Sequence, residues 1–214
     1  MEFISKELSE YCEQHTSPES PELRALNRET HLKVLSPRML SGHLQGAYLS
    51  FVSHMIRPLY VLEIGTYTGY SAICLVQGIR EGGKLISLDV NEETSLLAQT
   101  FIDKTPVKDK IELVVADAKA YIPGLTQRFD LVFIDADKRN YALYYDLVFD
   151  KVAPGGFIMI DNVLWSGKIT MPEEAMDKDT LAIHEFNKHV QNDSRVENVL
   201  LPIRDGIMMV RKKV

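Results

Sequence analysis

Short apolar runs alternate with amphipathic stretches through the middle of the chain. The runs occupy residues 59–65, 84–90, 111–117, 129–137 and 155–162. Each run is nearly continuous in valine, isoleucine, leucine and phenylalanine, which is typical of a parallel strand buried on both faces. The alternation of such strands with helices predicts a doubly wound α/β sheet.

Helices are predicted between these runs by residues that break or close a helical pattern. The helical stretches are 70–80, 91–104 and 140–152. A glycine pair at 82–83 follows the first stretch, Pro106 follows the second, and Pro154 follows the third. Glycine and proline at these places are typical signals that a helix has ended.

The C-terminal part has a different order of elements. A helix is predicted over residues 180–191, and two strands follow at 197–203 and 207–213. Asp205–Gly206 stands between the two strands, and this dipeptide favours a tight hairpin turn. We therefore expect an antiparallel strand pair at the end of the chain.

The N-terminal part is predicted to be helical. Apolar residues recur near the helical period at Phe3, Ile4, Leu8, Tyr11 and Cys12. Two prolines within residues 16–23 interrupt this pattern, and a second helix follows with Leu23, Leu26 and Thr30 on one side. A third helix is expected to end at Pro58. We interpret residues 1–40 as a helical appendage to one domain that spans residues 41–214.

Length and composition agree with one globular domain. The chain has 214 residues, of which 45% are hydrophobic and 25% charged, and these values exclude a disordered or low-complexity protein. No apolar stretch is long enough to span a bilayer, and the acidic first ten residues do not form a signal peptide. We therefore expect no membrane association.

Cysteine content and net charge indicate the compartment of the protein and the kinds of partner it binds. Cys12 and Cys74 are far apart in helical patterns, which excludes a disulfide framework and a zinc site and favours a cytoplasmic location. Lysine and arginine number 24 against 30 acidic residues, so the formal net charge is −6. A strongly basic nucleic-acid surface is not supported in bulk, although a local basic patch stays open.

Carboxylates or amides follow nearly every predicted strand. They are Glu63, Asp89, Asp117, Asp135 with Asp137, and Asp161 with Asn162. One acid at a strand end is often a helix cap or part of a solvated loop. Here polar side chains follow five predicted strands, and the carboxyl ends of these strands meet at one edge of the sheet, where ligands of open α/β sheets bind. Their mutual repulsion predicts that cations or hydroxyl groups share this space.

The turn after the first strand indicates the kind of ligand. Residues 63–69 read Glu-Ile-Gly-Thr-Tyr-Thr-Gly, which lacks the third glycine of the nicotinamide-binding pattern. Glu63 before the glycine suits a cationic ligand better than a pyrophosphate. Asp89 ends the second strand and is placed to bind two ribose hydroxyls, although it could instead cap the helix that starts at Asn91. S-adenosylmethionine fits, with its ribose on Asp89 and its amino-acid end near Glu63 and Gly65.

Oxygen ligands gather at the ends of two further strands. Asp135, Asp161 and Asn162 offer carboxylate and amide oxygens, and no histidine or cysteine accompanies them. Such a set suits Mg²⁺, or another divalent cation such as Mn²⁺ or Ca²⁺. The alternative is that Asp161–Asn162 forms a turn and that Asp135 is a cap.

Two residues near this set are candidates for chemistry on an acceptor. Lys138 lies three residues after Asp135 and is a candidate general base, or else a surface lysine. Trp165 follows Asp161–Asn162 and could line an acceptor pocket, or else pack against other side chains.

Other aromatic and histidine side chains are predicted to have structural roles. Three tyrosines at 141, 144 and 145 are expected to pack in the core, and His184 and His189 are expected to be solvated.

Longer strings of the chain resemble a known family. They are VLEIGTYTGYSAICL, LISLDVNEE, FDLVFIDADKRNYALYYD, APGGFIMIDNVLWSGK and LLPIRDGIMMVRKK. From about residue 34 to the end, the chain resembles the cation-dependent class I O-methyltransferases, which include caffeoyl-CoA and catechol O-methyltransferases. The resemblance implies a Rossmann-like sheet of seven mostly parallel strands with an antiparallel C-terminal strand. It also implies a homodimer.

The resemblance also implies a role for individual residues. The family's metal ligands fall on Asp135, Asp161 and Asn162, and its catalytic lysine falls on Lys138. The positions that match its contacts to S-adenosylmethionine are Ser41, Glu63, Gly65, Tyr67, Ser71, Asp89, Ala118 and Asp135. Ala116 departs from the glycine that many members have before Asp117–Ala118. Residues 1–40 and the loop 166–179 match no family pattern, so the acceptor is the least determined part.

We therefore expect transfer of a methyl group from S-adenosylmethionine to a hydroxyl of a small phenolic acceptor, either catechol-like or of hydroxycinnamoyl type. One alternative keeps the cofactor and metal but methylates a hydroxylated uridine in tRNA. Its phosphates would need a basic track, which Arg24, Arg28, His31, Lys33 and Arg38 could supply unless they are a solvated helix face. A nicotinamide-dependent oxidoreductase and a non-catalytic nucleoside-binding domain are the remaining alternatives.

Overall fold

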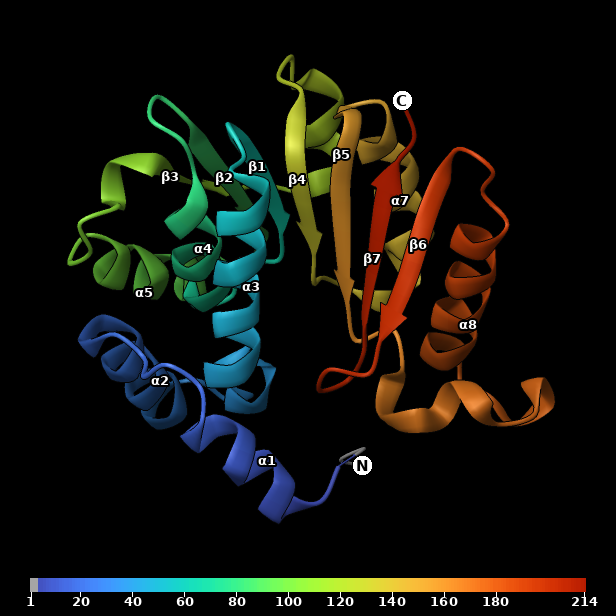
Figure 1. The fold of residues 1–214 in the computed structure, drawn as a ribbon, viewed down its shortest axis with the longest axis horizontal. Coiled ribbons are helices and arrows are strands. Elements are labelled where there is room, and N and C mark those ends of the chain that lie inside the picture. The colour runs from blue at the N-terminus through green and yellow to red at the C-terminus, as the bar shows by residue number, and fades with distance from the viewer. Residues whose placement is uncertain (1–3) are drawn as a thin grey trace.

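The computed structural model describes residues 4–214 and contains one seven-stranded sheet with helices on both faces (Figure 1). The strands are β1 Tyr60–Ile64, β2 Lys84–Asp89, β3 Ile111–Val115, β4 Phe129–Ile134, β5 Val152–Asp161, β6 Val196–Leu201 and β7 Ile207–Lys212. Their order is β3-β2-β1-β4-β5-β7-β6, and β7 runs antiparallel to both of its neighbours. The predicted mostly parallel sheet with an antiparallel C-terminal strand is therefore confirmed.

The order of strands reverses between β1 and β4. β1 pairs in parallel with β2 on one side and with β4 on the other. The connections from β1 and from β4 therefore leave in opposite directions and open a crevice beyond the carboxyl ends of these strands. Ligands of open α/β sheets bind in such a crevice.

The two faces of the sheet carry separate hydrophobic cores. Val61 of β1 and Leu131 and Phe133 of β4 face one core, while Leu62 and Val132 face the other. This alternation follows from the two-residue period of a strand, and it explains why the strands read as continuous apolar runs. Most positions of the central strands β1, β2 and β4 are buried by helices on one side or the other, whereas the edge strands β3 and β6 are mostly half-buried or exposed.

The helices divide between the two faces. α2 Pro21–Lys33, α3 Gly42–Ile56, α4 Tyr70–Leu75 and α5 Glu92–Ile102 supply one core, while α6 Ala118–Tyr121, α7 Tyr141–Phe149 and α8 Lys178–Gln191 supply the other. The predicted helix over 70–80 is shorter, because α4 ends in a 3₁₀ turn over Val76–Gly78. This turn packs closely against α3, since a Cβ atom on Gly78 would lie 2.1 Å from the backbone carbon of Ser53.

The N-terminal helices begin at serine caps. α1 Lys6–Gln14 and α2 are capped by Ser5 and Ser20, whose hydroxyl groups accept backbone N–H bonds. Leu26 and Thr30 of α2 are buried as expected, whereas α1 buries none of its residues. The expected contribution of Phe3 lies outside the described residues. None of the helices within residues 4–214 is long and apolar enough to cross a membrane.

The hairpin of β6 and β7 differs from the expected tight turn. The strands are antiparallel, but the last pair is Leu201 with Ile207, so the connection spans residues 202–206. Pro202 has no N–H to continue the ladder, which ends pairing earlier than the sequence pattern indicates. The loop is instead held by the segment after β5, where Leu164 N–H donates to the Asp205 carbonyl at 2.9 Å.

Candidate active site

The turn after β1 brings the ends of β1 and β4 into contact. Gly65 has φ +103°, and a Cβ atom there would lie 1.9 Å from the carbonyl oxygen of Asp135. Only glycine therefore fits, because both the backbone angle and the space exclude a side chain. The backbone of Tyr67 is strained, since its φ is +49°. The N–H of Tyr67 donates a hydrogen bond to Asp89 Oδ2 at 2.7 Å.

A cavity of about 1140 Å³ opens over this turn, at the carboxyl ends of the strands. The predicted site residues that line it are Ser41, Gly65, Tyr67, Ser71, Asp89, Ala118, Asp135, Lys138, Asp161 and Asn162. Trp165 also lines it. The structure thus gathers the residues predicted for donor, metal and base around one cavity at the point where strand order reverses.

Glu63 is the predicted site residue that does not line this cavity. It lies fully buried in β1, and its Oε2 accepts a hydrogen bond from Ser87 Oγ at 2.5 Å. Its Oε1 has no hydrogen-bond partner among residues 4–214. Burial raises the pKa of Glu63 to about 8, against the lowering effect of the nearby Ser71 hydroxyl and of the bond from Ser87.

Asp89 does not cap α5. That cap is Asn91, whose Oδ1 accepts the N–H of Thr94 at 3.1 Å. Asp89 instead accepts the N–H of Tyr67 through Oδ2 and that of Asn91 through Oδ1, at 2.7 and 2.9 Å. These bonds fix its carboxylate at the cavity wall, and each oxygen keeps a lone pair that can accept a hydroxyl.

Asp135, Asn162 and Lys138 meet at the end of β4 and β5. Lys138 Nζ donates to Asp135 Oδ1 at 3.0 Å and to Asn162 Oδ1 at 2.7 Å. Its side chain is 13% exposed, so it is not a surface lysine. Trp165 stands nearby, with its ring centre 5.8 Å from the same nitrogen.

Asp161 completes this group from the end of β5. It is 2% exposed, its Oδ1 accepts the N–H of Asn162 at 2.8 Å, and its Oδ2 accepts Gln45 Nε2 at 2.6 Å. Burial, and then the nearby charge of Asp135, raises the pKa of Asp161 to about 7. Asn162 adopts φ +60°, a conformation that non-glycine residues rarely take and that is concentrated at functional sites.

These residues form a donor set that fits a divalent cation. Oxygen atoms of Asp135 and Asn162 already converge on one positive group, the ammonium of Lys138. The mutual repulsion that raises the pKa of Asp161 is the repulsion that a bound dication would offset. Carboxylate and amide oxygens are the ligand types that Mg²⁺ and Mn²⁺ prefer.

Three residues at this site were not predicted from the sequence. Gln45 and Arg204 form a hydrogen-bonded chain to Asp161, and Tyr141 was expected only to pack in the core. Tyr141 is fully buried as expected, but its hydroxyl accepts from Lys138 Nζ at 2.5 Å and donates to the Asp161 carbonyl at 2.9 Å. A polar residue on the apolar face of the third predicted helix was the one available signal for Gln45. No sequence signal indicated Arg204.

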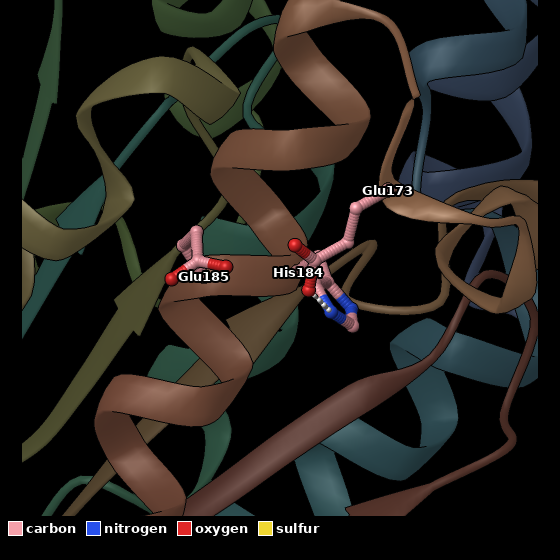
Figure 2. A group of neighbouring side chains, drawn as sticks. All are labelled: Glu173, His184 and Glu185. Atoms are coloured by element: carbon pink, nitrogen blue, oxygen red, sulfur yellow. Dashed lines mark ion pairs between the residues drawn. The ribbon is translucent and has the colours of Figure 1, made fainter. Parts of the chain in front are cut away.

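A second group of possible metal ligands lies on the outer surface, at α8. Figure 2 shows Glu173 and His184 facing each other, and Glu185 follows on the helix. His184 Nε2 lies 3.3 Å from Glu173, so this histidine is paired rather than simply solvated. Lys188 Nζ lies 2.6 Å from Glu173 and 3.1 Å from Glu185, and its ammonium already balances both carboxylates.

The chain is similar to O-methyltransferases over nearly its whole length. A family model described as O-methyltransferase matches residues 13–213. Caffeoyl-CoA O-methyltransferase of Stellaria longipes is 31% identical over 204 residues, covering 91% of this chain and 84% of that enzyme. Caffeoyl-CoA O-methyltransferase 1 of Arabidopsis thaliana is 32% identical and covers 97% of this chain and 85% of its own length.

Solved structures agree with this similarity. The SAH-bound methyltransferase PaMTH1 of Podospora anserina superposes with a TM-score of 0.90 at 26% identity, covering 99% of this chain and 97% of that one. The O-methyltransferase of Bacillus cereus in complex with SAH superposes with a TM-score of 0.86 at 25% identity, covering 97% of each chain. Both relatives were solved with SAH bound.

Proposed function

Because this chain belongs to the O-methyltransferase family and is an S-adenosylmethionine-dependent O-methyltransferase, we propose that it methylates a hydroxyl of a small catechol-like or hydroxycinnamoyl-type acceptor with the help of a divalent cation. One observation carries the proposal. The ends of β4 and β5 direct two oxygen ligands at the ammonium of Lys138, beside the cavity.

We assign donor binding to the cavity residues beside the β1 turn. Asp89 accepts the ribose hydroxyls, and the glycine at position 65 lets the ligand approach the backbone. Ser41 and Ser71 lie on the same cavity and are assigned to the amino-acid end of S-adenosylmethionine. The Oε1 atom of Glu63, which has no hydrogen-bond partner among residues 4–214, is assigned to accept a hydrogen bond from the ammonium group of the donor. Tyr67, Ala118 and Asp135 complete the proposed donor contacts.

We assign the cation to Asp135, Asp161 and Asn162. A divalent cation supplies Lewis acidity there, which lowers the pKa of an acceptor hydroxyl and orients it. Lys138 acts in its neutral form: its ammonium first releases a proton to solvent, and Nζ then accepts the hydroxyl proton, while Tyr141 and Asn162 hold this side chain in place through their oxygens. The acceptor oxygen then bonds to the methyl carbon as the bond from that carbon to sulfur breaks, which leaves S-adenosylhomocysteine. Trp165 lines the cavity on the acceptor side.

A methyl-transfer screen with radiolabelled S-adenosylmethionine tests the proposal. Catechols, hydroxycinnamoyl thioesters and bulk tRNA are offered as acceptors, each with Mg²⁺ and with a chelator. We expect label on a phenolic acceptor only when Mg²⁺ is present. Labelling that is equally fast in the chelator would remove the cation from the mechanism.

A tRNA acceptor is the second candidate, and two basic side chains favour it. Lys33 and Arg38 are exposed and also line the cavity, where phosphates of a larger acceptor would pass. Electrostatic binding of RNA weakens steeply as salt rises. Activity on tRNA that falls steeply with salt, without activity on phenols, would favour this acceptor. Uptake of label into neither class would leave both unsupported.

We also propose that the chain acts as a cytoplasmic homodimer. Cys12 and Cys74 are both free thiols, which suits a reducing compartment. Large apolar side chains are exposed on α3, where Phe51 is 64% and Met55 71% accessible. Exposed apolar side chains of this size suit burial against a second copy. Light scattering during size-exclusion chromatography measures the mass, and a 24.3 kDa species at micromolar concentration would contradict the dimer.

A further inference from the structure

One guanidinium joins the donor side and the metal side of the cavity. Arg204 lies in the loop between β6 and β7, and its Nη1 donates to the carbonyl oxygens of Leu40 and Ser41. The same nitrogen lies 3.0 Å from Oε1 of Gln45. Gln45 in turn donates through Nε2 to Asp161 Oδ2 at 2.6 Å. A continuous chain of hydrogen bonds thus connects the segment at Ser41 with Asp161.

The chemistry of its two neighbours fixes the direction of the Gln45 amide. Arginine can only donate hydrogen bonds, and a carboxyl oxygen with a free lone pair accepts the amide N–H. The amide oxygen must therefore face Arg204, and the amide nitrogen must face Asp161. Gln45 is fully buried, so water does not compete for either end. If Arg204 were absent, the buried amide oxygen would lose its partner and the amide could turn over.

Arg204 holds this place in an unfavourable backbone conformation. Its φ is +49°, which glycine adopts freely and a residue with a Cβ atom does not. Strain of this kind persists where the surroundings over-determine the conformation, and it is concentrated at functional sites. The contacts of the guanidinium with Leu40, Ser41 and Gln45 supply that constraint. A glycine here would relieve the strain and remove the contacts together.

We propose that Gln45 and Arg204 are positioning residues, which orient Asp161 for the cation and tie it to the donor-binding segment at Ser41. The inference rests on the proposed function, since it takes Asp161 as a cation ligand. Residues that orient metal ligands matter because a ligand that can turn away binds the ion less often. Their loss typically weakens metal binding about 10- to 100-fold.

The guanidinium of Arg204 should also couple binding of the donor to binding of the cation. Arg204 contacts Ser41 on the proposed donor side and, through Gln45, Asp161 on the proposed cation side. We expect each ligand to strengthen binding of the other by ordering its side of this hydrogen-bonded chain, and by linkage the two effects are equal. Without Arg204, this mutual strengthening should shrink.

Two substitutions test the relay in the full-length protein. Gln45→Met removes both amide groups at similar volume, and Arg204→Gly removes the guanidinium at a backbone angle that suits glycine. Electron paramagnetic resonance measures the dissociation constant of Mn²⁺, and calorimetry measures that of S-adenosylhomocysteine with and without Mn²⁺. We expect both variants to bind Mn²⁺ about 10- to 100-fold more weakly. We also expect Arg204→Gly to lose most of the effect of Mn²⁺ on S-adenosylhomocysteine binding.

Matched variants separate this role from a structural one. Arg57 also has a positive φ, +53°, at the exposed end of α3, so Arg57→Gly relieves the same strain outside the cavity. Gln77→Met removes an amide that bonds only to the Ile73 carbonyl of its own helical turn. Both controls should keep the wild-type affinity for Mn²⁺. Thermal melting identifies a variant that does not fold, and Arg204→Gly then decides the test, because glycine suits its backbone angle.

The outcomes distinguish this inference from the function on which it rests. If wild-type protein binds Mn²⁺ and both folded variants bind it within twofold of wild type, the relay is overturned while the metal site stands. If wild-type protein binds no Mn²⁺, the proposed metal site fails and the relay fails with it. Equal weakening in the Arg57→Gly control would also overturn the relay, because strain relief alone would then explain the effect.

Discussion

Lys138 is held in one place by its surroundings. Its ammonium is nearly buried between Asp135 and Asn162 and contacts the hydroxyl of Tyr141. A lysine held in this way has lost the rotamer freedom of a surface lysine, and its nitrogen stands at a fixed point beside the cavity. Fixed placement is what a general base requires.

Lys138→Ala should therefore reduce turnover far more than donor binding. We expect kcat to fall about 10²- to 10⁴-fold, the range of a general base, while the dissociation constant of S-adenosylhomocysteine stays nearly unchanged. Steady-state kinetics and calorimetry measure the two quantities. Lys119→Ala removes an exposed lysine that pairs with Asp117 at 3.6 Å and serves as the control. Unchanged turnover of Lys138→Ala would show that this lysine has no role in proton transfer.

Glu63 gives a pH dependence of stability. Its pKa is raised from 4.5 to about 8 by burial, so the folded state binds its proton more tightly than the unfolded state does. Between these two values the folded state holds more protons, and the free energy of unfolding therefore falls as pH rises. Glutamine does not titrate, so Glu63→Gln removes this fall in the free energy of unfolding. The variant should be more stable than wild type by about 1–3 kcal/mol at pH 7 and nearly equal to it near pH 4.5.

Urea unfolding at the two pH values measures the difference. Glu112→Gln, on an exposed position of β3, is the matched control and should give the same stability as wild type at both. A gain in Glu63→Gln that is equal at pH 4.5 and pH 7 would contradict a titrating Glu63.

The sequence predicted the carboxylates and the lysine of the site but not the residues that support them. Asp89, Asp135 and Asp161 each follow a buried apolar run, so their place at the sheet edge follows from local pattern. Gln45 and Arg204 lie 159 residues apart, and only the folded chain brings them together. Hydrogen bonds over such separations leave no periodic signal in a sequence.

At the scale of elements, the strands were predictable and the close contacts between helices were not. All seven strands appear within a few residues of their predicted bounds. For the central strands β1, β2 and β4 the reason is burial on both faces, which leaves a continuous apolar run. The shortening of α4 depends on the backbone of α3, and the length of the β6–β7 connection depends on Pro202 and on the segment after β5. Such tertiary causes override local propensity.

Gly78 should be essential to the packing of α3 against the turn after α4. A Cβ atom there would lie 2.1 and 2.2 Å from the carbonyl carbon and oxygen of Ser53, and rigid backbone must then move. We expect Gly78→Ala to lower the free energy of unfolding by about 3 kcal/mol. Gly124→Ala is the control, since its Cβ atom meets nothing within 4 Å, and it should change stability by less than about 0.5 kcal/mol. Equal effects in urea unfolding would contradict this contact.

At the scale of the whole molecule, topology places the residues proposed for the donor, the cation and the base at one edge of the sheet. β1 and β2 carry residues proposed for the donor, β4 and β5 lead to the proposed cation ligands, and these strands are neighbours in the sheet. Positioning of two reactants on a rigid frame can supply about 7–11 kcal/mol of rate enhancement. The strand order thus places the proposed donor and cation sites side by side.

Chelation should abolish activity without unfolding the protein. The cores on both faces of the sheet are built by apolar side chains, and the proposed cation ligands lie at the strand ends beside the cavity, so EDTA should leave the circular dichroism spectrum unchanged. Methyl transfer to a phenolic acceptor should stop in EDTA and return with excess Mg²⁺. Loss of folded structure in EDTA would show instead that the ion is part of the core.

Anomalous diffraction at the manganese edge, from crystals grown with Mn²⁺ and S-adenosylhomocysteine, tests the central claim most directly. We predict one strong peak within coordination distance of oxygen atoms of Asp135, Asp161 and Asn162, with the sulfur of S-adenosylhomocysteine in the same cavity and Lys138 displaced from between its two partners. A peak at Glu173, His184 and Glu185 with none at the sheet edge, or an Asp161 carboxylate turned away from the ion, would contradict the account.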